Sequence, residues 1–227
     1  MSDSGAWRDT SGRRLSDYPR PSVAVDTALL TVPLADRRLT WTPRPPELCV
    51  LLVSGGARED ARLPGTFLHE GERLADAVVR SLAEKAGVRG LAPRQLRVFD
   101  DPARDERGWV LSVAHVAAVP WAALEGVLDG RVELRPVAEA RGFPFDHDEI
   151  VAAAADALRA DYREAPDPAG LLPEPFTLRQ LQHVHQAVLG EELPKDSFRR
   201  RMEPLLEPVG EWTSGTVGKP ARLFGRV

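Results

Sequence analysis

The stretch from Leu63 to Val88 narrows the possible folds of this 227-residue chain more than any other segment. A polar loop containing Glu72 leads into a run in which apolar residues recur at helical spacing, and Gly87 supplies a residue type that commonly ends a helix. The apolar positions are Leu74, Ala77, Val78, Leu82 and Ala86. We therefore expect a loop, a helix over residues 72–86 with one buried face, and a second loop.

The other positions of this segment carry a more specific pattern. The segment resembles the Nudix box, a loop–helix–loop that hydrolyses diphosphates linked to another moiety. Six residues fall in register with that family's pattern: Glu72, Arg80, Leu82, Glu84, Gly87 and Val88. Three positions depart from it, because Thr66 replaces a glycine and both Ser81 and Lys85 replace glutamates. The resemblance therefore implies a Nudix fold whose catalytic motif is degenerate.

The departures bear on metal binding. Residues 81, 84 and 85 are three and four positions apart and so share a helix face, which in a working box presents carboxylates to Mg²⁺ or Mn²⁺. Here only Glu84 remains acidic, and the ammonium of Lys85 would repel a metal ion. We expect a nucleotide-shaped pocket with no catalytic residue, no metal and no cofactor. The rival interpretation is an active hydrolase of the ADP-ribose pyrophosphatase type, which would recruit ligands from Asp100, Asp101 and Glu106.

Composition and charge limit the partners. The net charge of −4 argues against a general nucleic-acid binder, but residues 171–227 carry eight Lys/Arg and seven Asp/Glu, a balance compatible with a DNA-binding domain. No apolar run approaches the ~20 residues that a membrane span needs, and the N-terminus lacks an apolar signal segment. We expect a cytoplasmic protein without a membrane partner. The single cysteine, Cys49, lies in an apolar run and is expected to be buried.

The order of predicted elements defines the domains. Residues 1–21 are polar and predict a flexible arm, and the segment 164–175 has four prolines and predicts a linker. Between them, residues 22–163 alternate strand and helix patterns, which indicates an α+β fold with a mixed sheet packed between helices, the α/β/α sandwich of Nudix domains. The expected strands cover residues 22–34, 47–53, 96–99, 109–119 and 131–137, and the expected helices cover 72–86, 120–128 and 146–162.

Residues 176–227 follow a different order. Thr177 and Gly190 bracket a capped helix, and the stretch 194–208 predicts a second helix that buries Phe198, Met202 and Leu205. Two short β-like runs follow, which is the order of a winged helix-turn-helix. The pair FTLRQLQHVHQAVLG and LPKDSFRRRM resembles the winged-helix domain of Nudix-related transcriptional regulators, the NrtR-like group. In that group a Nudix domain, often catalytically dead, senses a metabolite and the winged helix binds operator DNA.

The resemblance implies a homodimeric regulator, a repressor in NAD metabolism, with operator DNA and ADP-ribose or a related nucleotide as partners. The residues expected to contact DNA are Lys195, Ser197, Arg199, Arg200, Arg201, Lys219 and Arg222. Those expected to contact the effector are Phe67, Glu72, Arg80, Glu84, Arg104 and Arg107.

Simpler roles stay open. Glu72 and Arg80 are at least as well explained by a structural ion pair, and Glu84 by a lone residual metal ligand or a solvated helix position. The arginines 199–201 can form an ordinary exposed face, and a protein-interaction module remains a third functional class. Helix-surface or packing roles suit His183 and His185, and a capping or packing role suits His147. An interface or core role suits Trp212.

Overall fold

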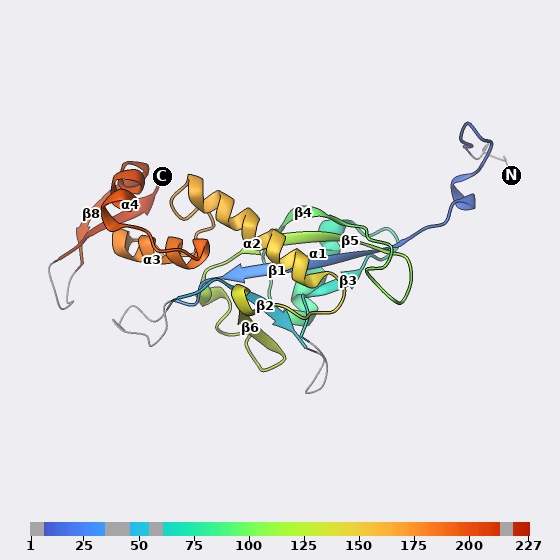
Figure 1. Cartoon of the computed structure of the whole chain (residues 1–227), viewed down its shortest axis with the longest axis horizontal. Coiled ribbons are helices and arrows are strands. Elements are labelled where there is room, and N and C mark those ends of the chain that lie inside the picture. Colours follow the sequence, from blue (N-terminus) through green and yellow to red (C-terminus); the bar gives the residue numbers. More distant parts are fainter. Residues whose placement is uncertain (1–6, 35–45, 55–60, 214–219) are drawn as a thin grey trace.

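The computed structural model describes residues 7–34, 46–54, 61–213 and 220–227. The molecule is elongated, with an N-terminal arm at one end, a sheet-containing domain in the middle and a smaller C-terminal domain at the other end (Figure 1). Within the described ranges, no helix combines the length and the apolar character that crossing a membrane requires.

The central domain is built on a six-stranded mixed sheet. Its strands run in the order β4-β5-β1-β2-β6, with the short β3 paired to β1, and β1 lies parallel to β5 while the other pairs are antiparallel. The strands are β1 (Ser22–Thr31), β2 (Cys49–Val53), β3 (Gly65–Phe67), β4 (Arg94–Phe99), β5 (Val110–Ala118) and β6 (Val132–Pro136). The expectation of a mixed sheet is confirmed.

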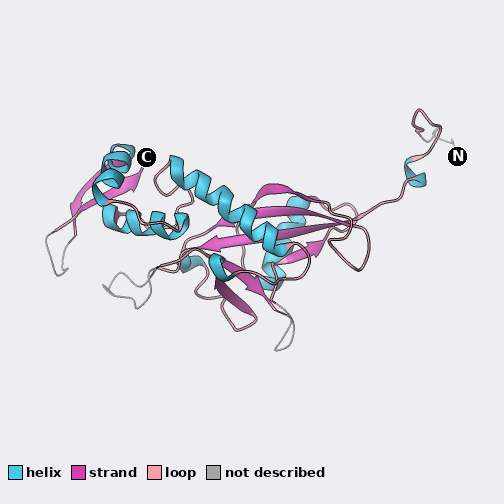
Figure 2. Cartoon of the chain, viewed as in Figure 1, coloured by secondary structure: helices cyan, strands magenta, loops and turns pink. Residues whose placement is uncertain are grey.

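Helices α1 (Leu74–Ala86) and α2 (His147–Glu164) cover opposite faces of this sheet (Figure 2). Successive strand residues point to opposite faces, so Leu29 packs with the α1 core and Leu30 with the α2 core. Because both faces are covered, eight consecutive residues of β1 from Ala24 are buried. The predicted α/β/α sandwich is confirmed.

The C-terminal domain has the predicted helix–helix–hairpin order. It consists of β7 (Phe176–Thr177), α3 (Leu178–Leu189), α4 (Lys195–Met202), β8 (Leu206–Trp212) and β9 (Arg222–Arg226), with the strands ordered β7-β9-β8. Thr177 and Gln180 form a capping box at the start of α3, and Gly190 ends it at a φ of 73°. The two cap predictions for this helix are confirmed.

Two predicted helices are shorter than expected. The segment 120–128 forms only a 3-10 turn over Trp121–Ala123, followed by turns. The second C-terminal helix ends at Met202, and a 3-10 turn over Glu203–Leu205 leads directly into β8. Burial of Leu205 was therefore a wrong prediction, since its side chain is 44% exposed. Pro204 explains the early end, because a proline has no backbone N–H to continue the helical hydrogen bonds.

The segment between α2 and β7 is packed rather than extended. Asp167, Leu171 and Leu172 are buried, and the two leucines belong to a core that runs from the α2 side of the sheet to Phe198 and Phe224 of the C-terminal domain. The segment that follows α2 thus contributes to a core shared by the two domains.

Candidate functional site

The loop–helix–loop contains a tightly built ion pair. Arg80 donates to both carboxylate oxygens of Glu72 at 2.8 Å, and also to the Thr66 hydroxyl at 3.2 Å and the Phe67 carbonyl at 3.0 Å. Hydrogen bonding to Arg80, with a further bond from the His69 amide, lowers the pKa of Glu72 to about 2. This pair fastens β3 to α1, which is the structural role that the sequence left open for Glu72 and Arg80.

The three positions of the former carboxylate face have different surroundings. The Ser81 side chain is completely buried, and its hydroxyl has no hydrogen-bond partner among the described residues. Lys85 donates to the carbonyl of Gly65, and burial together with the charge of Arg62 lowers the pKa of its ammonium. Glu84 is exposed and 4.0 Å from Arg80. Among the described residues, no group of three or more His, Cys, Asp or Glu side chains is arranged to hold a metal ion.

An aromatic–arginine cluster lies beside this loop. The guanidinium carbon of Arg107 is 5.4 Å from the ring centre of Phe67 and 4.8 Å from that of Phe145. Asp105 anchors Arg107 with two hydrogen bonds of 2.8 and 2.6 Å, yet 58% of the arginine side chain remains exposed. Phe145 has a φ of 62° and is 36% exposed. This phenylalanine was not among the predicted residues, and only the aromatic pair in FPFDHDEI hinted at it.

A buried polar network around Asp26 lies next to the loop that carries Arg107. Asp26 accepts a hydrogen bond of 2.6 Å from Ser112, lies 3.3 Å from His147 Nε2 and lies 3.6 Å from Arg104. His147 Nδ1 accepts from the Leu63 amide at 3.2 Å, so the Nε2 proton faces Asp26. Burial raises the pKa of Asp26, but the bonds from His147 and Ser112 and the charge of Arg104 outweigh it and lower the pKa overall.

Arg104 is committed within this network. It is 9% exposed and donates to Asp146 through two nitrogens, at 2.8 and 2.5 Å. An arginine held in this way supports the 104–107 loop from inside. Contacts of Arg104 and of Arg107 with an effector stay predictions, and Arg107 is the more exposed of the two side chains.

We predict that Asp26→Asn destabilises the fold by about 3 kcal/mol at pH 7, because it removes one partner of a buried charged network. The folded-state pKa of Asp26 is depressed, so its contribution is present above about pH 4 and is lost as pH falls through the folded value. Urea unfolding at pH 7 and at lower pH measures both effects. Asp129→Asn, on an exposed turn, is the control and should destabilise the fold far less than Asp26→Asn; equal losses for the two variants would refute the network's role.

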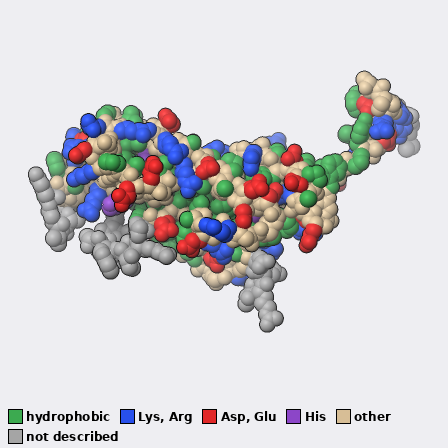
Figure 3. Space-filling view, viewed as in Figure 1, with side chains coloured by type: hydrophobic (Ala, Val, Ile, Leu, Met, Phe, Trp, Pro, Cys, Tyr) green, Lys and Arg blue, Asp and Glu red, His purple; other side chains and the backbone are tan. Residues whose placement is uncertain are grey.

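The second site is the outer surface of α4. Phe198 and Met202 are buried against α3, which leaves Lys195, Arg199 and Arg200 exposed as predicted from their spacing. Arg199 is paired with Glu203 at 2.7 Å, one helical turn away. Basic side chains gather over the C-terminal domain on the face seen in Figure 3. This arrangement suits contact with a phosphate backbone or with the edges of bases.

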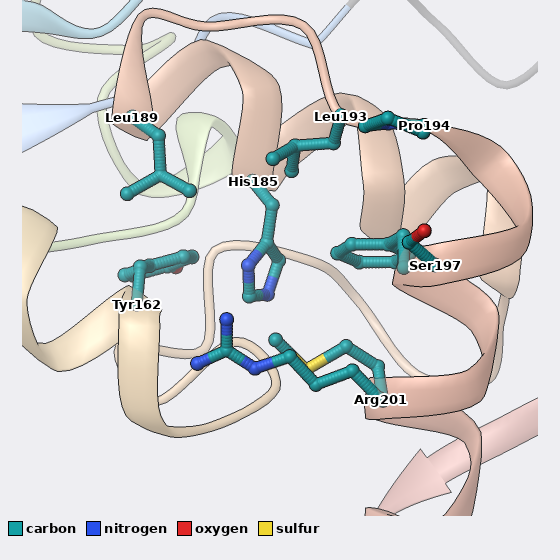
Figure 4. Close-up of a pocket in the computed structure, with 9 residues that line it drawn as sticks. Tyr162, His185, Leu189, Leu193, Pro194, Ser197 and Arg201 are labelled. Atoms are coloured by element: carbon teal, nitrogen blue, oxygen red, sulfur yellow. The ribbon is translucent and has the colours of Figure 1, made fainter.

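The other predicted DNA residues have varied positions. Ser197 is exposed on α4, and Arg222 is exposed on β9 with its guanidinium 5.6 Å from the Phe224 ring. Arg201 is also exposed, and its side chain borders a pocket together with His185 (Figure 4). Lys219 lies outside the described residues. Trp212 is 60% exposed, so it is not a core residue.

His183 and His185 lie on α3, and they differ. His183 is exposed, while His185 is completely buried between the rings of Tyr162 and Phe198, as the packing role predicts. No sequence pattern singled out Asp167, which is also completely buried. Asp167 accepts hydrogen bonds from Tyr162, the amides of Leu171 and Leu172, and Arg226 of β9. The carboxylate thereby joins the C-terminal end of α2 to the C-terminal domain.

Comparison with known proteins agrees with this two-part geometry. The sequence model of the NrtR DNA-binding winged helix domain matches residues 168–225. The crystal structure of Shewanella oneidensis NrtR complexed with a 27mer DNA superposes with a TM-score of 0.71 at 32% identity, over 90% of this chain and 93% of that one.

Two further relatives match most of the chain and its Nudix domain, respectively. The ADPR responsive transcriptional repressor NtrR of Acinetobacter baylyi is 29% identical over 92% of this chain and 83% of its own length. The NUDIX domain of S. oneidensis NrtR complexed with ADP ribose matches 70% of this chain and 99% of that domain, with a TM-score of 0.52 and 26% identity. The chain belongs to the NrtR family of Nudix-related transcriptional regulators.

Proposed function

We propose that this protein is a transcriptional repressor that binds operator DNA through its winged helix and senses ADP-ribose with its Nudix domain. The observation that carries the proposal is the match over nine-tenths of the chain to an NrtR solved with bound DNA, which includes both domains in the same order. The ADP-ribose complex of a related Nudix domain supports the effector. A gel-shift titration of the upstream region of its own gene tests the DNA part, and absence of any sequence-specific shift would overturn it.

We further propose that the Nudix domain does not hydrolyse its ligand. A working Nudix site needs carboxylates to hold divalent metal against the diphosphate. The residues present do not fit that ion, because Ser81 is neutral and buried and Lys85 is a cation aimed at Gly65. Glu84 alone remains at the exposed end of this face. The protein's chemistry is then recognition without turnover.

The expected result with ADP-ribose and Mg²⁺ is an intact ligand. We expect no release of AMP and ribose phosphate above a buffer control, since nothing at positions 81 and 85 activates water. Chromatography of the mixture measures this directly. Turnover on the order of 1 per second or faster, an ordinary enzyme rate, would establish the hydrolase interpretation instead.

Arg107 is our proposed phosphate ligand in the effector site. Its guanidinium is exposed but held in place by Asp105 and the two phenylalanine rings, so little freedom is lost when an anion binds. Phe67 and Phe145 would provide apolar walls for the nucleoside. Glu72, Arg80 and Glu84 would line the effector site beside these residues, held by the ion pairs among them.

Arg107→Ala should weaken ADP-ribose binding about tenfold, the effect expected for one charge-assisted hydrogen bond. Calorimetry on the parent and the variant measures the change. Arg89→Ala removes another exposed arginine, beyond the end of α1, and should bind like the parent. If Arg107→Ala also binds like the parent, the phosphate is held elsewhere.

We propose that the protein acts as a homodimer. Helix-turn-helix readers usually place two recognition helices on a two-fold operator, so a pair of chains matches the symmetry of the DNA. Lys195, Ser197, Arg199 and Arg200 would face the groove, and Arg222 would contact the backbone from the wing. Sedimentation of the free protein and of its operator complex gives the number of chains in each.

A further inference from the structure

The ammonium of Lys85 lies on the face of α1 where a working Nudix box carries carboxylates. Lys85 directly follows Glu84, lies one helical turn after Ser81, and donates a hydrogen bond to the carbonyl of Gly65 in β3. Helix α1 and strand β3 contact each other, as Figure 1 shows. The ammonium is therefore held between the helix and the strand that precedes it, within the degenerate motif.

The positive charge of Lys85 is not neutralised by an ion pair among the residues that the structure describes. The neighbouring arginines are all paired with carboxylates: Arg80 with Glu72, Arg104 with Asp146 and Arg107 with Asp105. Lys85 instead bonds a neutral carbonyl, and its side chain is exposed. Since an ammonium has several donor hydrogens, this side chain can still donate to an incoming anion.

The surroundings of Lys85 do not fully stabilise its charge. Burial, followed by the charge of Arg62, lowers the pKa of the ammonium, and Arg80 acts in the same direction. The charges of Asp26 and Glu84 oppose this effect without cancelling it. A bound anion would favour the charged form of the side chain, so an anion complements this position.

Strand β3 connects Lys85 with the aromatic–arginine cluster. Gly65 pairs with Asp26 of β1, and the two are so close that a side chain on Gly65 would collide with the Asp26 carboxylate. Phe67 lies two residues along the same strand, and its ring is covered by the guanidinium of Arg107. The charge of Asp26 acts on both Lys85 and Arg107. The two cations thus border one short strand, which suits a ligand with two phosphate groups.

A lysine at this position changes what the site needs from solution. In a working box, helix carboxylates hold a divalent cation that neutralises the diphosphate. Here Lys85 adds a positive charge where the family has a negative one, and the buried hydroxyl of Ser81 replaces a second carboxylate. The chain itself therefore carries the charge that a diphosphate requires. An ammonium binds phosphate as a point charge, without the fixed geometry of an arginine.

We propose that the Lys85 ammonium binds the diphosphate of the effector in place of a divalent cation, so that the Nudix domain recognises its ligand without metal. This inference rests on the proposed function, because ADP-ribose is the effector proposed there. It deepens that function by assigning the diphosphate to two cations of the chain, Lys85 and Arg107.

Calorimetry of the full-length protein with ADP-ribose, once in EDTA and once in Mg²⁺, tests the metal part and needs no variant. We expect the two affinities to lie within a few-fold of each other, since the chain supplies the cation. A parent protein that binds ADP-ribose only when Mg²⁺ is present would overturn the proposal.

Three variants measured in EDTA test the lysine itself. Lys85→Met keeps an unbranched stem without the charge and should bind ADP-ribose at least about tenfold more weakly than the parent, the effect of one charge-assisted hydrogen bond. Lys85→Glu should be weaker again, because a carboxylate repels the diphosphate. Arg89→Met makes the same charge change as Lys85→Met at an exposed position beyond the end of α1 and should bind like the parent. Circular dichroism verifies that all three fold.

Equal ADP-ribose affinity in Lys85→Met and Arg89→Met, or in Lys85→Met and Lys85→Glu, would refute the role of the charge and leave the proposed effector in place. Inorganic pyrophosphate, titrated without metal on the same samples, separates the two claims in the other direction. If the parent binds pyrophosphate more tightly than Lys85→Met does, while neither binds ADP-ribose, the anion site stands and the effector assignment fails. If the parent binds neither ligand without metal, the assignment of Lys85 is wrong.

Discussion

Replacing Asp167 with alanine is expected to destabilise the protein by about 3–5 kcal/mol, the cost typical of removing one partner from a buried charged network. The variant would leave the Tyr162 hydroxyl and two backbone amides without their acceptor, and Arg226 would keep only the Leu172 carbonyl and Glu174. Each buried donor left unpaired costs about 1–3 kcal/mol. Native domains have a free energy of unfolding of only about 5–15 kcal/mol, so this single change would remove a large part of the protein's stability.

Urea unfolding measures the loss of stability in Asp167→Ala, and two further variants separate its causes. Asp167 has a φ of 48°, which asparagine tolerates, so Asp167→Asn separates loss of the charge from backbone strain. Asp161→Ala removes an exposed carboxylate from the same helix end, paired with Arg94 at 3.0 Å, and should cost about 0–1 kcal/mol. If Asp167→Ala costs no more than Asp161→Ala, the network does not hold the junction together.

The Arg199→Ala, Arg200→Ala double variant is expected to bind its operator on the order of a hundredfold more weakly. A single arginine–base interaction is worth about 1–3 kcal/mol, and removing one arginine–phosphate interaction should flatten the slope of log K against log salt by roughly 0.9. Both side chains are exposed on α4, and Arg199 needs only to exchange Glu203 for DNA. Fluorescence anisotropy at several salt concentrations gives affinity and slope together.

The control for the operator measurement is Arg89→Ala, Arg131→Ala. It removes the same charge from two exposed positions of the Nudix domain and should bind operator within a few-fold of the parent. Circular dichroism and sedimentation verify that both double variants fold and assemble alike. If Arg199→Ala, Arg200→Ala instead binds operator as tightly as the parent at the same salt, α4 is excluded as the reading helix.

The helices were largely predictable because their signals are local. The apolar spacing of α1 and the capping residues of α3, Thr177 and Gly190, fix those elements within a few residues of the chain. The failed prediction at 120–128 lacked such caps and contained Gly126, and only a 3-10 turn forms there. Strands β3 and β7 have three and two residues, too few for an alternating pattern.

The sites were predictable only where one segment supplies them. The exposed arginines of α4 and the Glu72–Arg80 pair follow from spacing along one stretch of chain. In the Asp26 network, Asp26 and Ser112 are 86 positions apart in the sequence, and no local pattern indicates such a contact. Asp167 is similar, because the prolines around it suggest an exposed connector while its carboxylate is buried by residues from both domains.

Coupling between effector and operator is the central claim, and one pair of titrations tests it most directly. Operator affinity is measured with and without ADP-ribose, and ADP-ribose affinity with and without operator, at one salt concentration. Linkage requires the same factor in both, and we predict a change of roughly five- to 150-fold with the ligand recovered intact. If both affinities stay the same in the presence of the other ligand, this protein is not an ADP-ribose-responsive regulator.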